Sequence, residues 1–364
     1  VRPLNNEKIY TESQNTGIKL DQRIDFRGKI IEKENLSSTE ISQIVAYFSR
    51  FIETDFSFSN LREMDSKFSE FFSVDFSNAQ LQNSKISRST FSQSDFSNAD
   101  LTGSYITTSS FVNSDLTNSS FSDSDLNGVR IVSSILDNTK LQNVDFSHSY
   151  LENLSFTNSN LEGSKFIGAR IKSCSFDGTD FSTLVIHGDS LSSTEFLSCT
   201  ITHSTFSKIN MNNVDFSPKV ITTNNEGVLH TGSDLSNSLF VDSDLRMTMF
   251  SRSSSVEQFI KNYEILPGQY RENISTKLDY SKFYNVNLSD NDLGFISLRH
   301  SEIIDSDLTN ITFKNADLSF SSIVNSNLSG ANLQGANLQG ANLDGVNLAG
   351  AVLNCLNHPV CLNQ

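Results

Sequence analysis

Two cysteines and a histidine near the C-terminal end, Cys355, His358 and Cys361, stand close enough in sequence to act together. In an oxidising compartment two such thiols close a disulfide over the end of the fold, and in a reducing one they stay free. The same three side chains are metal ligands, but a closed zinc site takes four. The sequence leaves free thiols, a Cys355–Cys361 disulfide and a metal site as alternatives, and we predict no metal ion or other cofactor.

The other titratable residues form no recognisable catalytic motif. None of the 6 histidines stands in a hydrolase or metalloprotease pattern, and the 17 glycines form no phosphate-binding loop. Asp and Glu number 42 against 27 Lys and Arg, which gives a net charge of −15. We therefore predict that the protein is not an enzyme and does not bind nucleic acid directly. Its charged partners are expected to be basic protein surfaces.

A five-residue period runs through most of the chain. Large apolar residues stand at thirty consecutive positions of this period from Phe71 to Phe216, and the residue two places before each is usually small. Further units in shifted phases cover 235–250 and 278–353. Neither the 3.6-residue period of an α-helix nor the two-residue period of a strand produces this spacing. A strict short period indicates a solenoid in which each unit packs only on its neighbours.

The repeat resembles the pentapeptide repeat family, whose motif is roughly A(D/N)LXX. It stands here as Ala99-Asp100-Leu101-Thr102-Gly103 and Ala331-Asn332-Leu333-Gln334-Gly335. The resemblance implies an all-β solenoid, a right-handed quadrilateral β-helix with four pentapeptides per coil. The sequence adds short capping or inserted helices to it. Residues 20 apart are then expected to stack in one inward row about 4.8 Å apart, as a structural core of Phe156, Phe176, Phe196 and Phe216.

Four aspartates share one predicted outward face. Asp55, Asp75, Asp95 and Asp115 follow one another at intervals of 20 residues, each directly before a large apolar residue. One interpretation is a row of carboxylates that mimics the DNA backbone or binds cations, and so contacts a partner. The other is that Asp is simply common at this outward position.

Three residues in the middle of the chain depend on the predicted register. Cys174 and Cys199 both stand at small inward positions, and because they are 25 residues apart we expect them on different sides of the coil, unable to pair. Asp189 falls where a small inward residue belongs, next to His187. A local bulge and a functional pocket are the two interpretations of Asp189.

A solenoid end exposes apolar core and unpaired backbone, so the N-terminal end is expected to carry a cap. Ser37 and Glu40 have the spacing of a capping box, and apolar residues then follow at helical spacing from Ile41. These features predict a helix over about 38–50, with partner binding as its alternative role.

Two interruptions of the repeat are predicted to leave the solenoid, and such insertions often carry binding. The first has a turn containing Asn225 and Glu226 between two strand-like segments. The second has a capping box before a helical apolar face that includes Phe259 and Tyr263. We expect these four residues to contact a partner.

The predicted organisation has seven parts in chain order. They are an N-terminal capping segment (1–50), a first β-helix block (51–216), an inserted loop or hairpin (217–233), β-helix continued (234–250), an inserted helix and loop (251–277), a second β-helix block (278–353) and a C-terminal tail or cap (354–364).

The function predicted from these features is a non-enzymatic scaffold or protein–protein interaction module with a rigid acidic surface. Two alternatives follow from the resemblance: a DNA mimic that binds a type II topoisomerase, and the substrate-binding β-helix part of a secreted bacterial effector. No apolar run reaches the length of about 18 residues that spans a membrane. No signal peptide is visible and Val1 is not Met, so an N-terminal piece is expected to have been removed, and a cytoplasmic and a secreted bacterial protein both remain. A bare solenoid end would support a homodimer.

Overall fold

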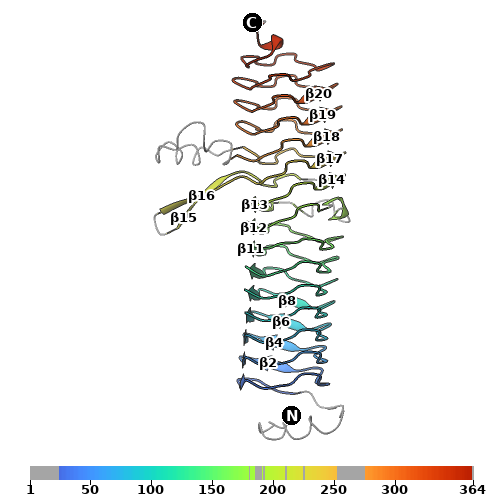
Figure 1. The fold of residues 1–364 in the computed structure, drawn as a ribbon, viewed down its shortest axis with the longest axis vertical. Helices are drawn as coiled ribbons and strands as arrows, with labels where there is room; N and C mark the ends of the chain where they lie inside the picture. Colours follow the sequence, from blue (N-terminus) through green and yellow to red (C-terminus); the bar gives the residue numbers. More distant parts are fainter. Residues whose placement is uncertain are drawn as a thin grey trace. The chain divides into compact units, whose positions relative to one another are not determined.

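The computed structural model of the chain describes residues 24–179, 181–184, 191, 193–209, 211–223, 226–251 and 275–362. The chain divides into two compact units, unit 1 (Val1–Phe166) and unit 2 (Ile167–Gln364). Both are all-β parallel solenoids, and together they make about 12 turns. The coils of each unit are visible in Figure 1 as stacked rungs.

Unit 1 holds two parallel sheets of three-residue strands. Each strand pairs with a strand of the next coil, so that Ile31 pairs with Phe51 and Phe51 with Phe71. One sheet has the order β1 (Ile30–Glu32), β3 (Arg50–Ile52), β5 (Glu70–Phe72), β7 (Thr90–Ser92), β9 (Ser110–Val112), β10 (Arg130–Val132) and β11 (Tyr150–Glu152). The other has the order β2 (Val45–Tyr47), β4 (Asp65–Lys67), β6 (Lys85–Ser87) and β8 (Tyr105–Thr107).

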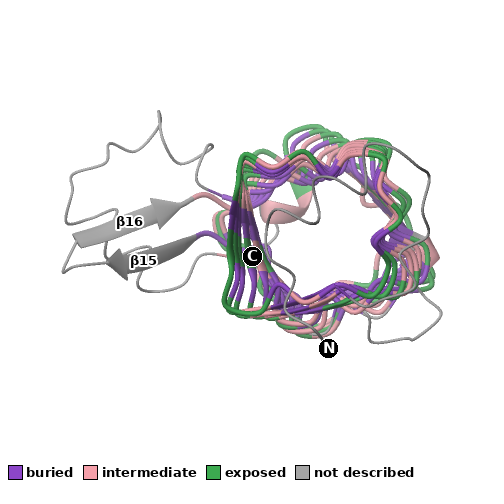
Figure 2. Ribbon diagram, turned by 90° about the horizontal axis from the view of Figure 1, so that it is seen from below, coloured by how far each residue is buried: buried purple, intermediate pink, exposed green. Residues whose placement is uncertain are grey.

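The five-residue period determines which side chains fill the interior. Phe71 and Phe91, one coil apart, are both fully buried, and their rings stack with centroids 4.6 Å apart. Two residues after each such position the backbone turns a corner with a positive φ, for example 58° at Asn98 and Asn118. Asn, Asp and Gly tolerate this left-handed conformation better than other residues. Figure 2 shows buried residues, in purple, recurring at the same places around the coils.

Serine is the usual small inward residue because its hydroxyl joins adjacent coils. The backbone N–H of Ser84 donates to Oγ of Ser104 at 3.1 Å, and that hydroxyl donates to the carbonyl of Leu81 at 3.0 Å. The same N–H to Oγ bond recurs between Ser49 and Ser69 at 3.1 Å. Serine therefore fills a narrow core position while satisfying a buried backbone group that alanine would leave to weaker partners.

The helix expected over about 38–50 is wrong, since these residues form ordinary coils of unit 1. Ile41 and Ala46 are buried at the five-residue spacing, and the corners at Gln43 and Phe48 have φ values of 63° and 55°. The five-residue pattern continues through this segment, but its core position at 46 is a small alanine, and the apolar spacing from Ile41 imitates a helix.

Unit 2 keeps the parallel coils but with irregular lengths. Its strands are β12 (Arg170–Lys172) paired with β13 (Glu195–Leu197), and a sheet of β14 (Thr205–Ser207), β17 (Leu239–Val241), β18 (Lys282–Tyr284), β19 (Glu302–Ile304) and β20 (Ser322–Val324). An antiparallel hairpin of β15 (Lys219–Thr223) and β16 (Glu226–His230) projects from these coils (Figure 1). Two short 3-10 helices, η1 (Phe181–Leu184) and η2 (Pro359–Leu362), are the helical elements within the described part of the chain.

The extra residues leave the core of unit 2 intact. Phe181, Phe206, Phe240 and Phe283 stack in succession with ring centroids 4.7, 4.7 and 4.6 Å apart. Their sequence separations all exceed 20, so each coil passes its surplus outward. The inserted helix expected within 251–277 falls largely outside the described residues, as do Phe259 and Tyr263.

The predicted inward row of Phe156, Phe176, Phe196 and Phe216 is buried, but its register is wrong in unit 2. Phe196 and Phe216 stack with centroids 5.0 Å apart. Phe176 lies edge-on to Phe196 instead, because Phe196 pairs with Ile171, which is 25 residues earlier. The coil between them is longer than the repeat predicts, which moves every later residue of unit 2 to a new partner.

Candidate functional site

The four aspartates of the predicted acidic row lie on one face of unit 1. Asp55, Asp75, Asp95 and Asp115 are joined in succession by β-bridges between neighbouring coils, and all four are half-buried. Each carboxylate accepts a bond from the backbone N–H two residues later, at 2.9, 2.8, 2.7 and 2.9 Å. Asp125 and Asp145 make the same bond on another face. This turn-closing bond explains why Asp is common here and applies beyond the acidic row.

A second surface of unit 1, which we call the aromatic corner of unit 1, consists of Phe48, Phe68 and Arg88. These residues occupy the same corner on three consecutive coils, since the N–H of Phe48 donates to the carbonyl of Lys67 and that of Phe68 to Ser87. The two rings stack with centroids 5.1 Å apart and planes 1° apart. The guanidinium of Arg88 lies 5.3 Å from the ring of Phe68.

Both rings of this corner face water in an unfavourable backbone conformation. Phe48 is 68% exposed and Phe68 is 45% exposed. Their φ values are 55° and 54°, in the left-handed region where a side chain costs about 1–2 kcal/mol. At most other corners of the unit the chain uses smaller or polar residues. Neither packing nor backbone geometry therefore explains two phenylalanines here.

Charged and aromatic groups flank the aromatic corner of unit 1. The ammonium of Lys67 lies 4.9 Å from the ring of Tyr47, whose hydroxyl donates to Asp65. This hydrogen bond, together with burial, raises the pKa of Tyr47 above its usual value. On the other flank Arg50 pairs with Glu70 at 2.8 Å.

A surface depression of about 410 Å³ lies on the sheet face that follows this corner. Phe72, which is 45% exposed, lines it together with Ile52 and the Arg50–Glu70 pair. Apolar side chains bordered by an ion pair are a combination that suits protein contacts.

Unit 2 has a comparable surface, the aromatic corner of unit 2, formed by Tyr280, His300 and Phe320. The rings stack in succession with centroids 4.9 and 5.1 Å apart. A Cβ at Gly340, the next residue of this corner, would lie 2.7 Å from the ring of Phe320, so Phe320 covers the glycine. Beside Tyr280 is a depression of about 360 Å³, which Asp279 and Arg299, paired at 2.9 Å, also line.

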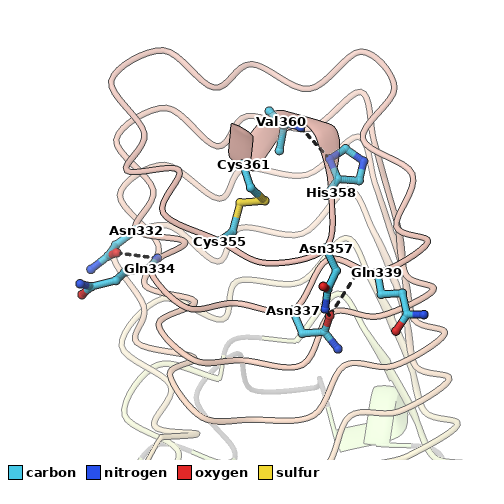
Figure 3. The surroundings of a disulfide bond; sticks show 9 residues. All are labelled: Asn332, Gln334, Asn337, Gln339, Cys355, Asn357, His358, Val360 and Cys361. Carbon is cyan, nitrogen blue, oxygen red and sulfur yellow. Dashed lines mark hydrogen bonds between the residues drawn. A yellow bond between two sulfur atoms is a disulfide. The ribbon is translucent and has the colours of Figure 1, made fainter. Parts of the chain in front are cut away.

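The C-terminal end of unit 2 is closed by a disulfide. Cys355 and Cys361 are bonded, with Cα atoms 5.1 Å apart, under η2 (Figure 3). His358 Nδ1 accepts a hydrogen bond from the N–H of Val360 at 3.2 Å, which engages the third potential ligand of the predicted metal alternative. Among the described residues no group of three His, Cys, Asp or Glu side chains is placed to hold a metal ion.

The last coil over which this disulfide sits is only partly covered. Leu343, Leu348 and Leu353 are half-buried, whereas Leu333 and Leu338 one coil earlier are 1% and 0% exposed. An incompletely covered apolar coil is a surface on which another chain can pack.

The remaining predicted contact residues are only partly described. Glu226 begins β16, and its backbone pairs with Thr223 across the hairpin. Asn225 and Asp189 lie outside the described residues. The hairpin leaves and re-enters unit 2 between Phe216 and Ser233, whose N–H donates to the carbonyl of Phe216 at 3.0 Å.

Both aromatic corners were missed in the sequence. The available signal was an aromatic residue two places after the large apolar one, repeated at 20-residue spacing: Phe48 and Phe68, and then Tyr280, His300 and Phe320. No helix within the described ranges has both the length and the apolar character that crossing a membrane requires.

Comparison with protein families gives matches over both units. A family model described as "Pentapeptide repeats (8 copies)" matches residues 49–88, 75–111, 281–319, 292–330 and 321–357. A second, "Pentapeptide repeat region", matches residues 104–184. Together the matches cover more than half of the 364 residues. No curated protein matches the chain.

Among solved structures the chain is similar to HetL, a pentapeptide repeat protein involved in heterocyst differentiation regulation in the cyanobacterium Nostoc. The identity is 19%, with 82% of this chain and 89% of HetL covered, at a TM-score of 0.19. Full-length QnrB1, a plasmid-mediated fluoroquinolone resistance protein, is 12% identical over 66% of this chain and 99% of its own, at a TM-score of 0.24. A pentapeptide repeat protein of the Arabidopsis thaliana thylakoid lumen is 19% identical over 39% of this chain and 68% of its own, at a TM-score of 0.20.

Proposed function

The chain belongs to the pentapeptide repeat family, and from that premise we propose that it is a non-enzymatic protein-interaction module. Its coils are right-handed and four-sided in this proposal, because the backbone turns at every fifth residue and each regular coil takes 20. Flat faces and protruding corners then offer a partner a surface without a reaction chamber.

The observation that carries the proposal is the aromatic corner of unit 1. Phe48 and Phe68 hold two apolar rings in water at positions where the backbone disfavours them. Such a cost is retained when the exposed groups are used, and aromatic and arginine side chains supply much of the energy of protein interfaces. We assign Phe48, Phe68 and Arg88 to the contact surface for a protein partner.

Asparagine substitutions test this assignment without disturbing the fold. Asn tolerates a left-handed corner, so the double variant Phe48→Asn/Phe68→Asn keeps the coil while removing both rings. The control is Phe58→Asn, which removes another phenylalanine that is 62% exposed at a corner with φ 57°. Affinity capture with quantitative mass spectrometry is expected to show proteins that bind wild type and Phe58→Asn but not the double variant. Identical captured sets for all three proteins would remove the aromatic corner from the interface.

A second candidate function, DNA mimicry toward a type II topoisomerase, is favoured by the acidic row and the net charge of −15. A basic surface that grips DNA would then be the partner. The test is a gyrase supercoiling assay with added protein and with the triple variant Asp75→Asn/Asp95→Asn/Asp115→Asn. Inhibition or relief of quinolone poisoning that the variant loses would support mimicry, whereas no effect of the wild type would eliminate it.

The partly covered last coil extends the proposal to a homodimer through the solenoid end. The variant Leu348→Asp places a charge on that coil, and Asn347→Asp adds the same charge to an exposed neighbour. Sedimentation is expected to show a dimer for wild type and Asn347→Asp and a monomer for Leu348→Asp. A monomeric wild type at all concentrations would contradict it.

The two insertions of unit 2 remain proposed partner contacts. Asn225 and Glu226 at the hairpin turn, and Phe259 and Tyr263 in the second insertion, are the residues assigned. Replacing these four by alanine is expected to weaken capture of the same partner that the aromatic corner of unit 1 binds, and unchanged capture would exclude them.

A further inference from the structure

Cys174 and Cys199 are neighbours in the core of unit 2, contrary to the expectation from their spacing. The 25-residue coil brings β12 and β13 into register, with Ile171 opposite Phe196. Three residues further along each coil stand the two cysteines, and the N–H of Thr200 donates to the carbonyl of Cys174 at 2.9 Å. The same coil lengthening that displaces Phe176 therefore aligns the two cysteines.

Both thiols occupy the small inward position that serine fills elsewhere. Each cysteine is 2% exposed, and both are free thiols. Sγ of Cys199 lies 3.6 Å from the carbonyl oxygen of Ile171, on the coil of Cys174. A serine at the same position reaches back to the preceding coil in the same way, as the Ser104 hydroxyl does to Leu81. The Cys199 thiol is thus directed from its own coil toward that of Cys174.

The backbone arrangement suits a covalent bond between them. Paired strands lie about 4.8 Å apart, and disulfide-bonded cysteines have Cα atoms about 4.4–6.8 Å apart. Neighbouring inward side chains of a parallel ladder point the same way, so the Cα–Cβ bonds do not diverge. The Cys355–Cys361 disulfide, with Cα atoms 5.1 Å apart, shows that this chain already carries one oxidised cysteine pair.

We propose that Cys174 and Cys199 form a dithiol site that a hydroperoxide oxidises to an internal disulfide joining two consecutive coils. One thiolate attacks a peroxide oxygen, which breaks the O–O bond, gives a sulfenic acid and releases water or an alcohol. The second thiol then displaces the sulfenic hydroxyl as water and forms the S–S bond. Both sulfurs are oxidised and the peroxide is reduced, so atoms and electrons balance.

The expected consequence is a fastened irregular coil. The bond closes the loop between the two cysteines, which contains η1, and closing a loop restricts the unfolded chain more than the folded one. The oxidised protein is therefore expected to melt at a higher temperature than the reduced one. Reduction by a dithiol reagent reverses the shift.

Peptide mapping after oxidation tests the site. Wild type is treated with hydrogen peroxide, free thiols are alkylated under denaturing conditions, and the chain is cleaved after Glu195, which lies between the two cysteines. The expected result is a disulfide-linked pair of peptides carrying Cys174 and Cys199, with loss of both alkylation sites and a raised melting temperature. Cys199→Ser, which places the usual ladder residue there, is expected to lose the link and the shift. Cys355→Ser is expected to retain both.

A second arm removes limited peroxide access to the core as an explanation for a negative result. The denatured, reduced chain is refolded in a glutathione redox buffer, in which thiol–disulfide exchange supplies the oxidant before the core closes. A Cys174–Cys199 link in either arm supports the site. Two alkylatable core thiols after both arms, or sulfinic acid at either cysteine in place of the link, would overturn the proposal.

Discussion

Phe206 and Phe240 stack with ring centroids 4.7 Å apart and planes 3° apart, although the coils they belong to are offset by 34 residues. Two core residues that are ordinary neighbours in space are thus separated by a complete hairpin in sequence. The solenoid of unit 2 tolerates this because each coil contacts only the coils beside it, so surplus residues leave the stack without breaking it.

This relationship predicts that the hairpin is dispensable for folding. Deleting residues 218–231 restores the 20-residue offset and joins Ser217 to Gly232, which then takes the left-handed corner after Phe216. The free energy of unfolding is expected to change by no more than about 1 kcal/mol, because loop length has a weak effect on closure entropy. Urea unfolding followed by circular dichroism measures it.

The matched control deletes the same number of residues one position later. Removing 219–232 leaves Pro218 at the corner, and proline cannot adopt a positive φ. This variant is expected to be clearly less stable than the first. Equal stability of the two deletions would contradict the assigned register.

The aromatic corner of unit 1 is predicted to contribute little to stability. In Phe48→Asn/Phe68→Asn the relief of left-handed strain, about 1–2 kcal/mol per residue, opposes the loss of ring stacking, about 0.5–1.5 kcal/mol. Chemical denaturation is expected to give a stability at least equal to that of wild type. A loss comparable to that of a core change such as Phe91→Ala, about 3–5 kcal/mol, would make these rings structural.

The serine ladder offers a matched pair of substitutions. Ser104 Oγ accepts from the N–H of Ser84 and donates to Leu81, whereas the buried hydroxyl of Ser84 itself has no hydrogen-bond partner. Ser104→Ala is therefore expected to cost about 1 kcal/mol or more, and Ser84→Ala to be neutral or stabilising. Urea unfolding of both variants checks this, and the opposite ranking would contradict the hydrogen bonding described.

Asp100 predicts a pH dependence of unit 1. Burial raises the pKa of this carboxyl, but hydrogen bonds from the hydroxyl and N–H of Thr102 and from Gln82, with the charge of Arg62, outweigh burial and hold it below the usual value. Because the folded pKa is the lower one, Asp100 stabilises the fold above its unfolded pKa of about 3.9. That contribution is lost as pH falls through the folded pKa.

The variant Asp100→Asn is accordingly expected to be less stable than wild type at neutral pH, with the difference shrinking below about pH 4. Urea unfolding at several pH values measures the difference. Asp137→Asn, which changes another half-buried carboxylate of the unit, serves as control. A difference that grows as the pH falls would contradict the direction of the shift.

Much of the candidate site could be placed from the sequence, but its meaning could not. The 20-residue spacing of Asp55, Asp75, Asp95 and Asp115 put them on one face, while the hydrogen bond each makes to its own turn appears only in three dimensions. Phe48 and Phe68 were hidden because helical spacing from Ile41 imitates the repeat. Whether an aromatic residue next to the core points inward or outward depends on the corner geometry.

The amino-acid sequence by itself determined the period, and with it which side chains are buried, because a side chain's orientation repeats with the local backbone turn. Only the tertiary structure decided which coils are neighbours. Pairing between coils depends on how many residues each one carries, and nothing local marks a coil of 25 instead of 20. For that reason Cys174 and Cys199, which the period alone sets on different sides, lie in one row of the core, where hydrogen bonds between the coils align them.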